Sequence, residues 1–61
     1  MEDLRRKVKE LRRKRGWAQE DLAREIEVSL STVQRWEKRG GKPHRLIRRE
    51  LMRLLQEAGI Q

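Results

Sequence analysis

The chain has 61 residues, a length that supports one small domain and leaves no room for a substrate cleft beside a packed core. Its 17 Lys and Arg residues against 10 Asp and Glu residues give a net charge of +7, which is typical of a protein that meets phosphates or an anionic membrane surface. It has no cysteine, one histidine and no apolar run longer than two residues, which excludes disulfides, metal-ligand clusters and a membrane-spanning segment, and no cofactor is expected.

The first 15 residues carry the spacing of an amphipathic helix. Leu4, Val8 and Leu11 recur on one face, so we predict a helix over residues 2–15. Acidic residues begin this segment and basic residues end it, as the helix dipole favours. Gly16 is expected to end the helix, because glycine adopts the left-handed conformation of a C-terminal cap without strain.

A second, shorter helix is predicted over residues 19–26, with Leu22 and Ala23 facing inward. Ala18 has no side-chain oxygen and is therefore a poor N-cap for this helix. We expect the carboxylate of Asp21 to compensate by accepting a hydrogen bond from a backbone N–H group at the start of the helix.

The three residues that follow, 27–29, leave room only for a tight turn. Ser29 is a good N-cap, and a third helix is predicted over residues 30–39. Val33 and Trp36 are expected to hold this helix on the core, because both lie on its apolar face.

Glycine and proline mark the next boundary, because residues 40–43 read GGKP. A fourth helix is predicted over residues 44–58 and is closed by Gly59. The fold class predicted for residues 1–61 is therefore all-α, a single compact bundle of four helices. The core is expected to contain Leu4, Val8, Leu11, Trp17, Leu22, Ala23, Ile26, Val28, Val33, Trp36, Ile47, Leu51, Leu54 and Leu55, whereas Leu30, Met52 and Ile60 are expected outside it.

Two short helices joined by a three-residue turn, inside a basic domain, match a helix-turn-helix, whose second helix enters the major groove of DNA. A small residue is needed where the two helices cross, and Ala23 stands at that point. The chain resembles the lambda-repressor-like family, which includes Cro and the phage and bacterial repressors, over residues 11–43, LRRKRGWAQEDLAREIEVSLSTVQRWEKRGGKP. Its regular use of Arg, Lys, Glu and Leu is also typical of a computationally designed version of such a domain.

The resemblance implies non-catalytic, sequence-specific binding of double-stranded DNA, with the helix over residues 30–39 in the major groove. It places Leu30, Ser31 and Arg35 where family members touch base edges. Gln34 shares a helix face with Leu30, and Arg35 shares one with Ser31, so these four side chains form the expected base-reading surface. Arg35 is expected to carry specificity, because its planar fork can donate two hydrogen bonds to guanine.

Phosphate contacts are expected on both sides of this surface. The resemblance implies one at the start of the second helix, the N-terminus of the third helix favours anions, and the basic loop after the third helix flanks the groove edge. The residues assigned to this role are Gln19, Thr32, Lys38, Arg39, Lys42, His44 and Arg45. The resemblance also implies that Arg12 and Glu37 form an ion pair that ties the first helix to the third.

The sequence departs from the family pattern at three points. Glu27 stands where the family usually has glycine, and Ala18 stands where it usually has Ser or Thr. The family's fifth helix, which often helps dimerisation, has no counterpart after Gln61, so a monomer that binds one short site is expected. A natural protein of this kind would act at the nucleoid in the cytoplasm.

Three other readings of the basic helices remain open. A helix on an anionic membrane needs a continuous apolar face, which Gly16 and the turn at residues 27–29 interrupt. A helical protein-binding module needs an exposed apolar patch, and RNA binding is compatible with the charge although A-form RNA does not admit a helix in its major groove. An enzyme is the least favoured class, because a single loop histidine cannot assemble a catalytic group.

Overall fold

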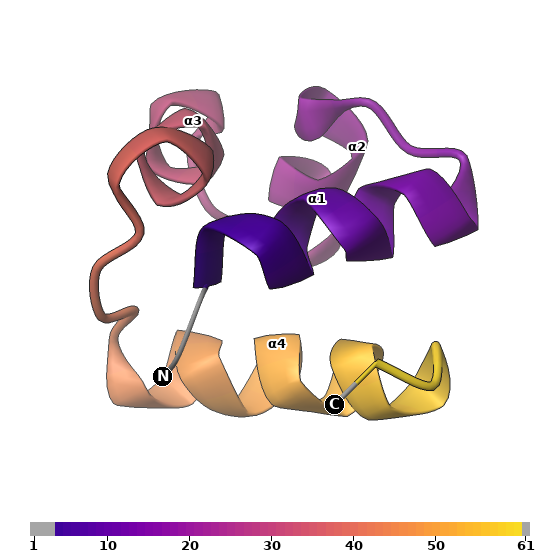
Figure 1. The fold of residues 1–61 in the computed structure, drawn as a ribbon. Helices are drawn as coiled ribbons and strands as arrows, with labels where there is room; N and C mark the ends of the chain where they lie inside the picture. The colour runs from indigo at the N-terminus through magenta and orange to yellow at the C-terminus, as the bar shows by residue number, and fades with distance from the viewer. Residues whose placement is uncertain (1–3, 61) are drawn as a thin grey trace.

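The computed structural model describes residues 4–60, and over these residues the chain is all helix and connecting turn. The helices are α1 (Leu4–Arg15), α2 (Gln19–Glu25), α3 (Leu30–Arg39) and α4 (Arg45–Glu57). In Figure 1, α2 and α3 lie at the top, α4 forms the base, and α1 crosses between them. α1 packs on both α3 and α4, and α2 packs on α3. The predicted all-α fold is therefore confirmed; the acidic first turn predicted at residues 2 and 3 lies outside the described residues.

The end of α1 has the hydrogen bonds of a Schellman motif. Gly16 has φ +69°, its N–H donates to the carbonyl of Arg13 at 3.2 Å, and the N–H of Trp17 donates to the carbonyl of Arg12 at 2.8 Å. The indole of Trp17 packs on the core while the guanidinium of Arg15 lies 5.9 Å from its ring centroid. Gly16 therefore turns the chain towards α2, as its place in the sequence predicts.

α2 begins without a side-chain cap at Ala18. Instead, the backbone N–H of Ala18 donates to Oδ2 of Asp21 at 2.8 Å, which is the compensation expected from the sequence. Asp21 also lies 3.6 Å from Arg24 one turn further along. The hydrogen bond to the carboxylate of Asp21 thus partly compensates for the missing side-chain cap.

The turn from α2 to α3 places Glu27 in a left-handed conformation, with φ +58°. The N–H of Glu27 donates to the carbonyl of Arg24, and the N–H of Val28 donates to the carbonyl of Ala23 at 2.9 Å. This is again a Schellman motif, with a glutamate where glycine is the usual residue. Because the motif starts from Ile26 as the C-cap, α2 ends one residue earlier than predicted.

α3 is capped at both ends as its sequence predicts. The hydroxyl of Ser29 accepts a hydrogen bond from the N–H of Thr32 at 3.2 Å, which satisfies one of the free donors of the first turn. At the other end, Gly40 has φ +77° and donates from its N–H to the carbonyl of Trp36 at 2.9 Å. The helix between these caps buries Val33 and Trp36 on the core.

α4 is one residue shorter at each end than the predicted range 44–58. His44 is the N-cap, because its Nδ1 accepts a hydrogen bond from the N–H of Leu46 at 3.3 Å. Beyond the last turn, Gly59 has φ +76° and the N–H of Ile60 donates to the carbonyl of Leu55 at 2.8 Å. This turn folds Ile60 back onto the core with 5% of its surface exposed, so the prediction that it lies outside the core is wrong.

The core lies between α1 and the other three helices. Its buried apolar residues are Leu4, Val8, Leu11, Leu22, Ala23, Ile26, Val33, Trp36, Leu51, Leu54, Leu55 and Ile60. Trp17, Val28 and Ile47, which were predicted in the core, are half-buried and pack against it. Leu46 is 59% exposed and contributes little to the core. None of the helices within residues 4–60 combines the length and the apolar character needed to cross a membrane.

Candidate nucleic-acid interface

The outward face of α3 carries the four side chains that were assigned to base contact. Leu30 is 39% exposed, and Ser31, Gln34 and Arg35 are exposed as well. They lie on the side of the helix turned away from its buried residues, as a spacing of 3.6 residues per turn requires. The structure thus brings these side chains together on one accessible helical surface.

Three hydroxyl groups gather at the N-terminus of α3. The Oγ of Ser29 lies 3.1 Å from the Oγ of Ser31 and 2.8 Å from the Oγ1 of Thr32. The hydroxyls of Ser31 and Thr32 can still donate or accept elsewhere, because a hydroxyl has one proton and two lone pairs, whereas these two contacts and the N–H of Thr32 fill the capacity of Ser29. This end of the helix also carries the positive end of the helix dipole, so it can accommodate an anionic group next to neutral donors.

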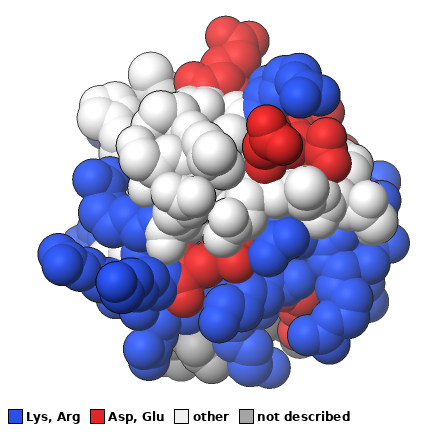
Figure 2. Space-filling view, turned by 90° about the horizontal axis from the view of Figure 1, so that it is seen from above, with Lys and Arg blue, Asp and Glu red and all other residues white. Residues whose placement is uncertain are grey.

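Charge is distributed unevenly around this surface. Figure 2, seen from the side of α2 and α3, shows uncharged atoms over part of the face, Lys and Arg over its lower half and left edge, and acidic groups at the upper right. Residues 18–33 contain one Arg against two Glu and one Asp in α2 and the Glu of the turn, a net charge of 1 − 4 = −3. The positive charge therefore lies on α1 and on the chain from Arg35 onward.

The positive edge of the interface is formed by the end of α3 and the loop that follows it. Exposed side chains there are those of Lys38, Arg39, Lys42, His44 and Arg45, all of which were assigned to phosphate contact. Gly40 is buried at the start of the loop, where a Cβ would lie 3.6 Å from Cγ of Arg5, and its positive φ is the stronger reason for glycine. Gly41 has φ +101° and leads the exposed chain on towards Lys42.

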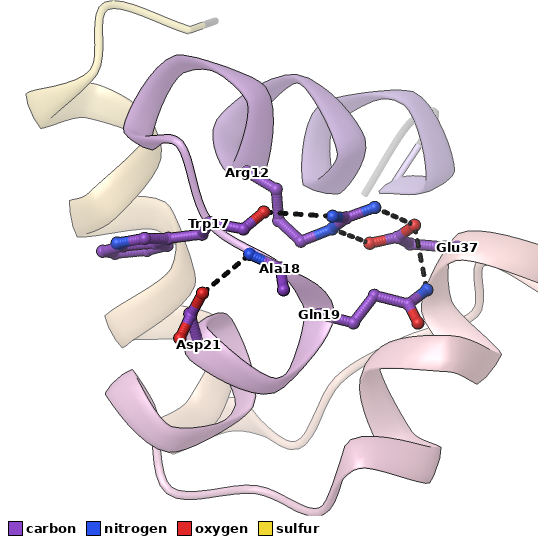
Figure 3. A network of polar contacts seen from close by, with 6 residues as sticks. All are labelled: Arg12, Trp17, Ala18, Gln19, Asp21 and Glu37. Atoms are coloured by element: carbon purple, nitrogen blue, oxygen red, sulfur yellow. Dashed lines mark hydrogen bonds and ion pairs between the residues drawn. The ribbon is translucent and has the colours of Figure 1, made fainter.

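A partly buried ion pair holds α3 against α1 (Figure 3). Arg12 donates from Nε to Oε2 of Glu37 and from Nη2 to Oε1 at 2.8 Å, so the pair is bidentate. The Nη1 of Arg12 donates to the carbonyl of Trp17 at 3.1 Å, which ties the turn after α1 into the same network. The ion pair implied by the resemblance is therefore present.

Gln19 completes this network from the first residue of α2. Its Nε2 donates to Oε1 of Glu37 at 3.2 Å. The sequence predicts a phosphate contact for Gln19 and carries no sign of this hydrogen bond, because nothing local to Gln19 points to a residue 18 positions away. One amide proton of Gln19 is thus engaged within the domain, and the rest of its half-buried amide group remains available.

The network also sets the protonation of its two charged members. Burial raises the pKa of Glu37, but hydrogen bonds from Arg12 and Gln19 and the positive charges of Arg12 and Lys9 together lower it below its usual range. The hydrogen bond to Glu37 raises the pKa of Arg12. Glu37 is 7% exposed, so its charge is held by these contacts and not by water. Both groups are charged at neutral pH, and three of the four helices are joined at one carboxylate.

No three His, Asp or Glu side chains within residues 4–60 are arranged to hold a metal ion.

The family model described as helix-turn-helix matches residues 8–56, which is well over half of the chain and includes every residue assigned above to the interface. Searches of curated proteins and of solved structures gave no match. With the two helices, the four-residue connection between them at residues 26–29 and the outward face of α3 in place, the match is decisive: the chain belongs to the Cro/XRE-type helix-turn-helix family of DNA-binding domains.

Proposed function

We propose that this domain reads a short sequence of duplex DNA by placing α3 in the major groove. The observation that carries the proposal is the division of α3 into two faces. Val33, Trp36 and Glu37 are buried and fix the helix, while its other side is exposed and polar apart from Leu30. A rigid helix with such a face fits the width of the B-form major groove.

Each exposed side chain has a chemistry that suits a base edge. Arg35 can donate two hydrogen bonds to O6 and N7 of guanine, and such a bidentate contact is worth about 1–3 kcal/mol of discrimination against other bases. Gln34 can pair in the same way with N6 and N7 of adenine, and Leu30 can contact the methyl group of thymine. The proposed specificity therefore rests mainly on Arg35.

Phosphate contacts would orient the helix without reading sequence. The exposed cations from Lys38 to Arg45 lie at one end of α3, and Thr32 and Gln19 lie near the N-termini of α3 and α2. The acidic surface of α2 opposes any approach that would bring it against the DNA backbone. This asymmetry supports a single docking orientation, in which one copy binds one short site.

The test is a selection from a pool of randomised duplexes, performed with the wild-type chain and two variants. The wild type should enrich a short motif that contains guanine. Arg35→Ala should lose the guanine preference, because the bidentate donor is gone. Lys42→Ala is the matched control: it also removes one exposed cation, and it should weaken binding to all duplexes while leaving the motif unchanged.

The outcomes separate sequence reading from general attraction to nucleic acid. No enriched motif, or a motif that survives Arg35→Ala, would show that α3 does not read bases. A duplex RNA of the selected sequence provides a further arm, because its deep, narrow major groove does not admit a helix. Equal affinity for the RNA duplex would contradict insertion of α3 in the groove.

A further inference from the structure

The outer face of α4 carries a groove. Of the residues that line it, Arg45 alone is assigned to the proposed DNA contact. The groove has a volume of about 370 Å³ and is lined by Arg45, Arg48, Arg49, Met52, Arg53 and Gln56. Figure 1 shows α4 at the base of the molecule, with α2 and α3 on the opposite side. The outer face of α4 points away from the core, so a duplex engaged by α3 would leave the groove open.

The positive charge in this groove is largely unbalanced. Arg53 is paired within its own helix, with Nη2 at 2.7 Å from Glu50 and Nη1 at 3.0 Å from Glu57. In the part of the chain that the structure describes, no ion pair joins Arg48 or Arg49 to a carboxylate. Two guanidinium groups one residue apart therefore face solvent without an acidic partner among residues 4–60.

An apolar side chain lies between these cations. Met52 is 37% exposed and lines the groove one turn beyond Arg48 and Arg49. A thioether side chain adapts to the shape of a partner, and an apolar centre with a charged rim is the usual anatomy of a protein interface. The groove therefore offers a partner an apolar contact at Met52 and a positively charged rim.

We propose that this groove binds an acidic amphipathic helix of a partner protein. An apolar side chain of the partner would pack on Met52, and carboxylates beside it would meet Arg48 and Arg49, whose planar forks suit carboxylates. Met52 lies one turn, ~5.4 Å, beyond Arg48 along α4, so an apolar side chain and a carboxylate one turn apart on the partner would face this pair. Binding at this groove does not depend on whether α3 reads DNA.

Other anionic partners fit the groove less well. A duplex offers phosphates but no apolar group on its backbone for Met52. An anionic membrane would require a continuous apolar face, and the charged side chains around Met52 interrupt one. The combination of two unpaired arginines with a partly exposed methionine favours a protein helix.

The experiment measures fluorescence anisotropy of a labelled peptide of about 15 residues, a length at which a helix can form. The peptide contains Glu and Ala with two leucines four residues apart, and a second peptide has serine in place of both leucines. The protein is tested as wild type, Arg49→Gln, Met52→Gln and Arg13→Gln. Arg13 is an exposed arginine of α1, so its substitution removes the same charge outside the groove.

The leucine peptide should bind the wild type, and Arg49→Gln and Met52→Gln should each weaken binding about five- to tenfold. Arg13→Gln should have little effect, and the serine peptide should bind weakly. Equal losses for Arg13→Gln and Arg49→Gln, or equal binding of the two peptides, would show attraction to net charge alone and overturn the proposal. Tighter binding of phosphatidylserine vesicles or of a second duplex through Arg49 and Met52 would also overturn it.

Circular dichroism of each variant checks that the helices are intact. Affinity for a DNA duplex should stay the same in Arg49→Gln and Met52→Gln, because neither residue belongs to the proposed DNA contact. Arg45 is not substituted in this experiment, since it is also assigned to a phosphate. Failure of peptide binding with DNA binding retained would therefore refute the groove proposal alone.

Discussion

Glu27 adopts a conformation that costs energy for any residue with a Cβ. Among the residues from 4 to 60 it is the one non-glycine with positive φ, at +58°. Substitution Glu27→Gly should raise the free energy of unfolding by about 1 kcal/mol, because the strain of the left-handed conformation exceeds the added entropy of glycine in the unfolded chain. Urea denaturation followed by circular dichroism measures this change.

A matched control for Glu27 stands two residues earlier. Glu25 is also exposed and acidic, but it is the last residue of α2 and has no positive φ. Glu25→Gly should therefore destabilise the domain, by at most about 1 kcal/mol, because glycine gains entropy in the unfolded chain and relieves no strain here. If both substitutions change stability in the same direction, the account of strain at Glu27 is wrong.

The charge of Glu37 links stability to pH. Burial raises the pKa of Glu37, but its contacts with Arg12 and Gln19 and the charge of Lys9 bring it below its usual range. As the pH falls, the unfolded chain takes up a proton at Glu37 before the folded chain does. The stabilisation from the ionised carboxylate of Glu37 is therefore present above the ordinary glutamate pKa of about 4.3 and is lost as the pH falls below it.

This dependence can be isolated with Glu37→Gln. The wild type should lose more stability between about pH 7 and pH 3 than the variant does, because the variant has no carboxylate to protonate. Glu20→Gln, at an exposed site, should lose as much as the wild type, and it controls for the rise in net charge. Equal losses in all three proteins would contradict the assigned role of Glu37.

At the scale of elements, the close approach of α2 and α3 depends on a small side chain. Ala23 is 5% exposed and belongs to the core, on the helix that packs against α3. Ala23→Leu should destabilise the domain by about 1–3 kcal/mol through overpacking. It should also weaken DNA binding in the fraction that remains folded, because α3 is displaced from α2.

The control for Ala23 is Ala18→Leu, at an exposed position before the same helix. This change should leave thermal stability and DNA affinity nearly unaltered. Thermal denaturation and a duplex titration of both variants give the comparison. A tolerated leucine at position 23 would mean that the crossing is not closely packed.

The ends of the helices could be predicted from sequence because their causes are local. Gly16 and Ser29 determine an end and a start within two or three residues of themselves, and Asp21 accepts from an N–H group three residues away. The shared face of Leu30 and Gln34 follows in the same way from helical periodicity. These features need no knowledge of where the other helices lie.

The structural features that could not be predicted from the sequence depend on tertiary contacts. Ile60 is buried because the turn at Gly59 folds it onto the core, and Gln19 meets Glu37 only because α2 and α3 cross. Lys14 donates to the carbonyl of Ala58 at 3.0 Å, a contact between chain segments 44 residues apart. Such contacts depend on packing and leave no periodic signal in the sequence.

At the scale of the whole molecule, the net charge of +7 predicts DNA binding that weakens steeply with salt. The logarithm of the affinity should fall linearly with the logarithm of the salt concentration, with a slope near −0.9 per phosphate contact. Lys42→Ala should reduce the magnitude of this slope by about 1. A substitution at Arg48, in the α4 groove, should leave the slope unchanged, and an equal change at both positions would contradict the assignment of the loop to phosphate contact.

Recognition of a base by Arg35 of α3 is tested most directly by a double-mutant cycle of duplex-binding affinities. The affinities of the wild type and of Arg35→Ala are measured for the selected duplex and for a duplex with its guanine replaced by adenine. The wild type should prefer the guanine duplex by about 1–3 kcal/mol, and Arg35→Ala should bind both duplexes equally. A preference of the same size in both proteins would contradict the claim that α3 reads the base through Arg35.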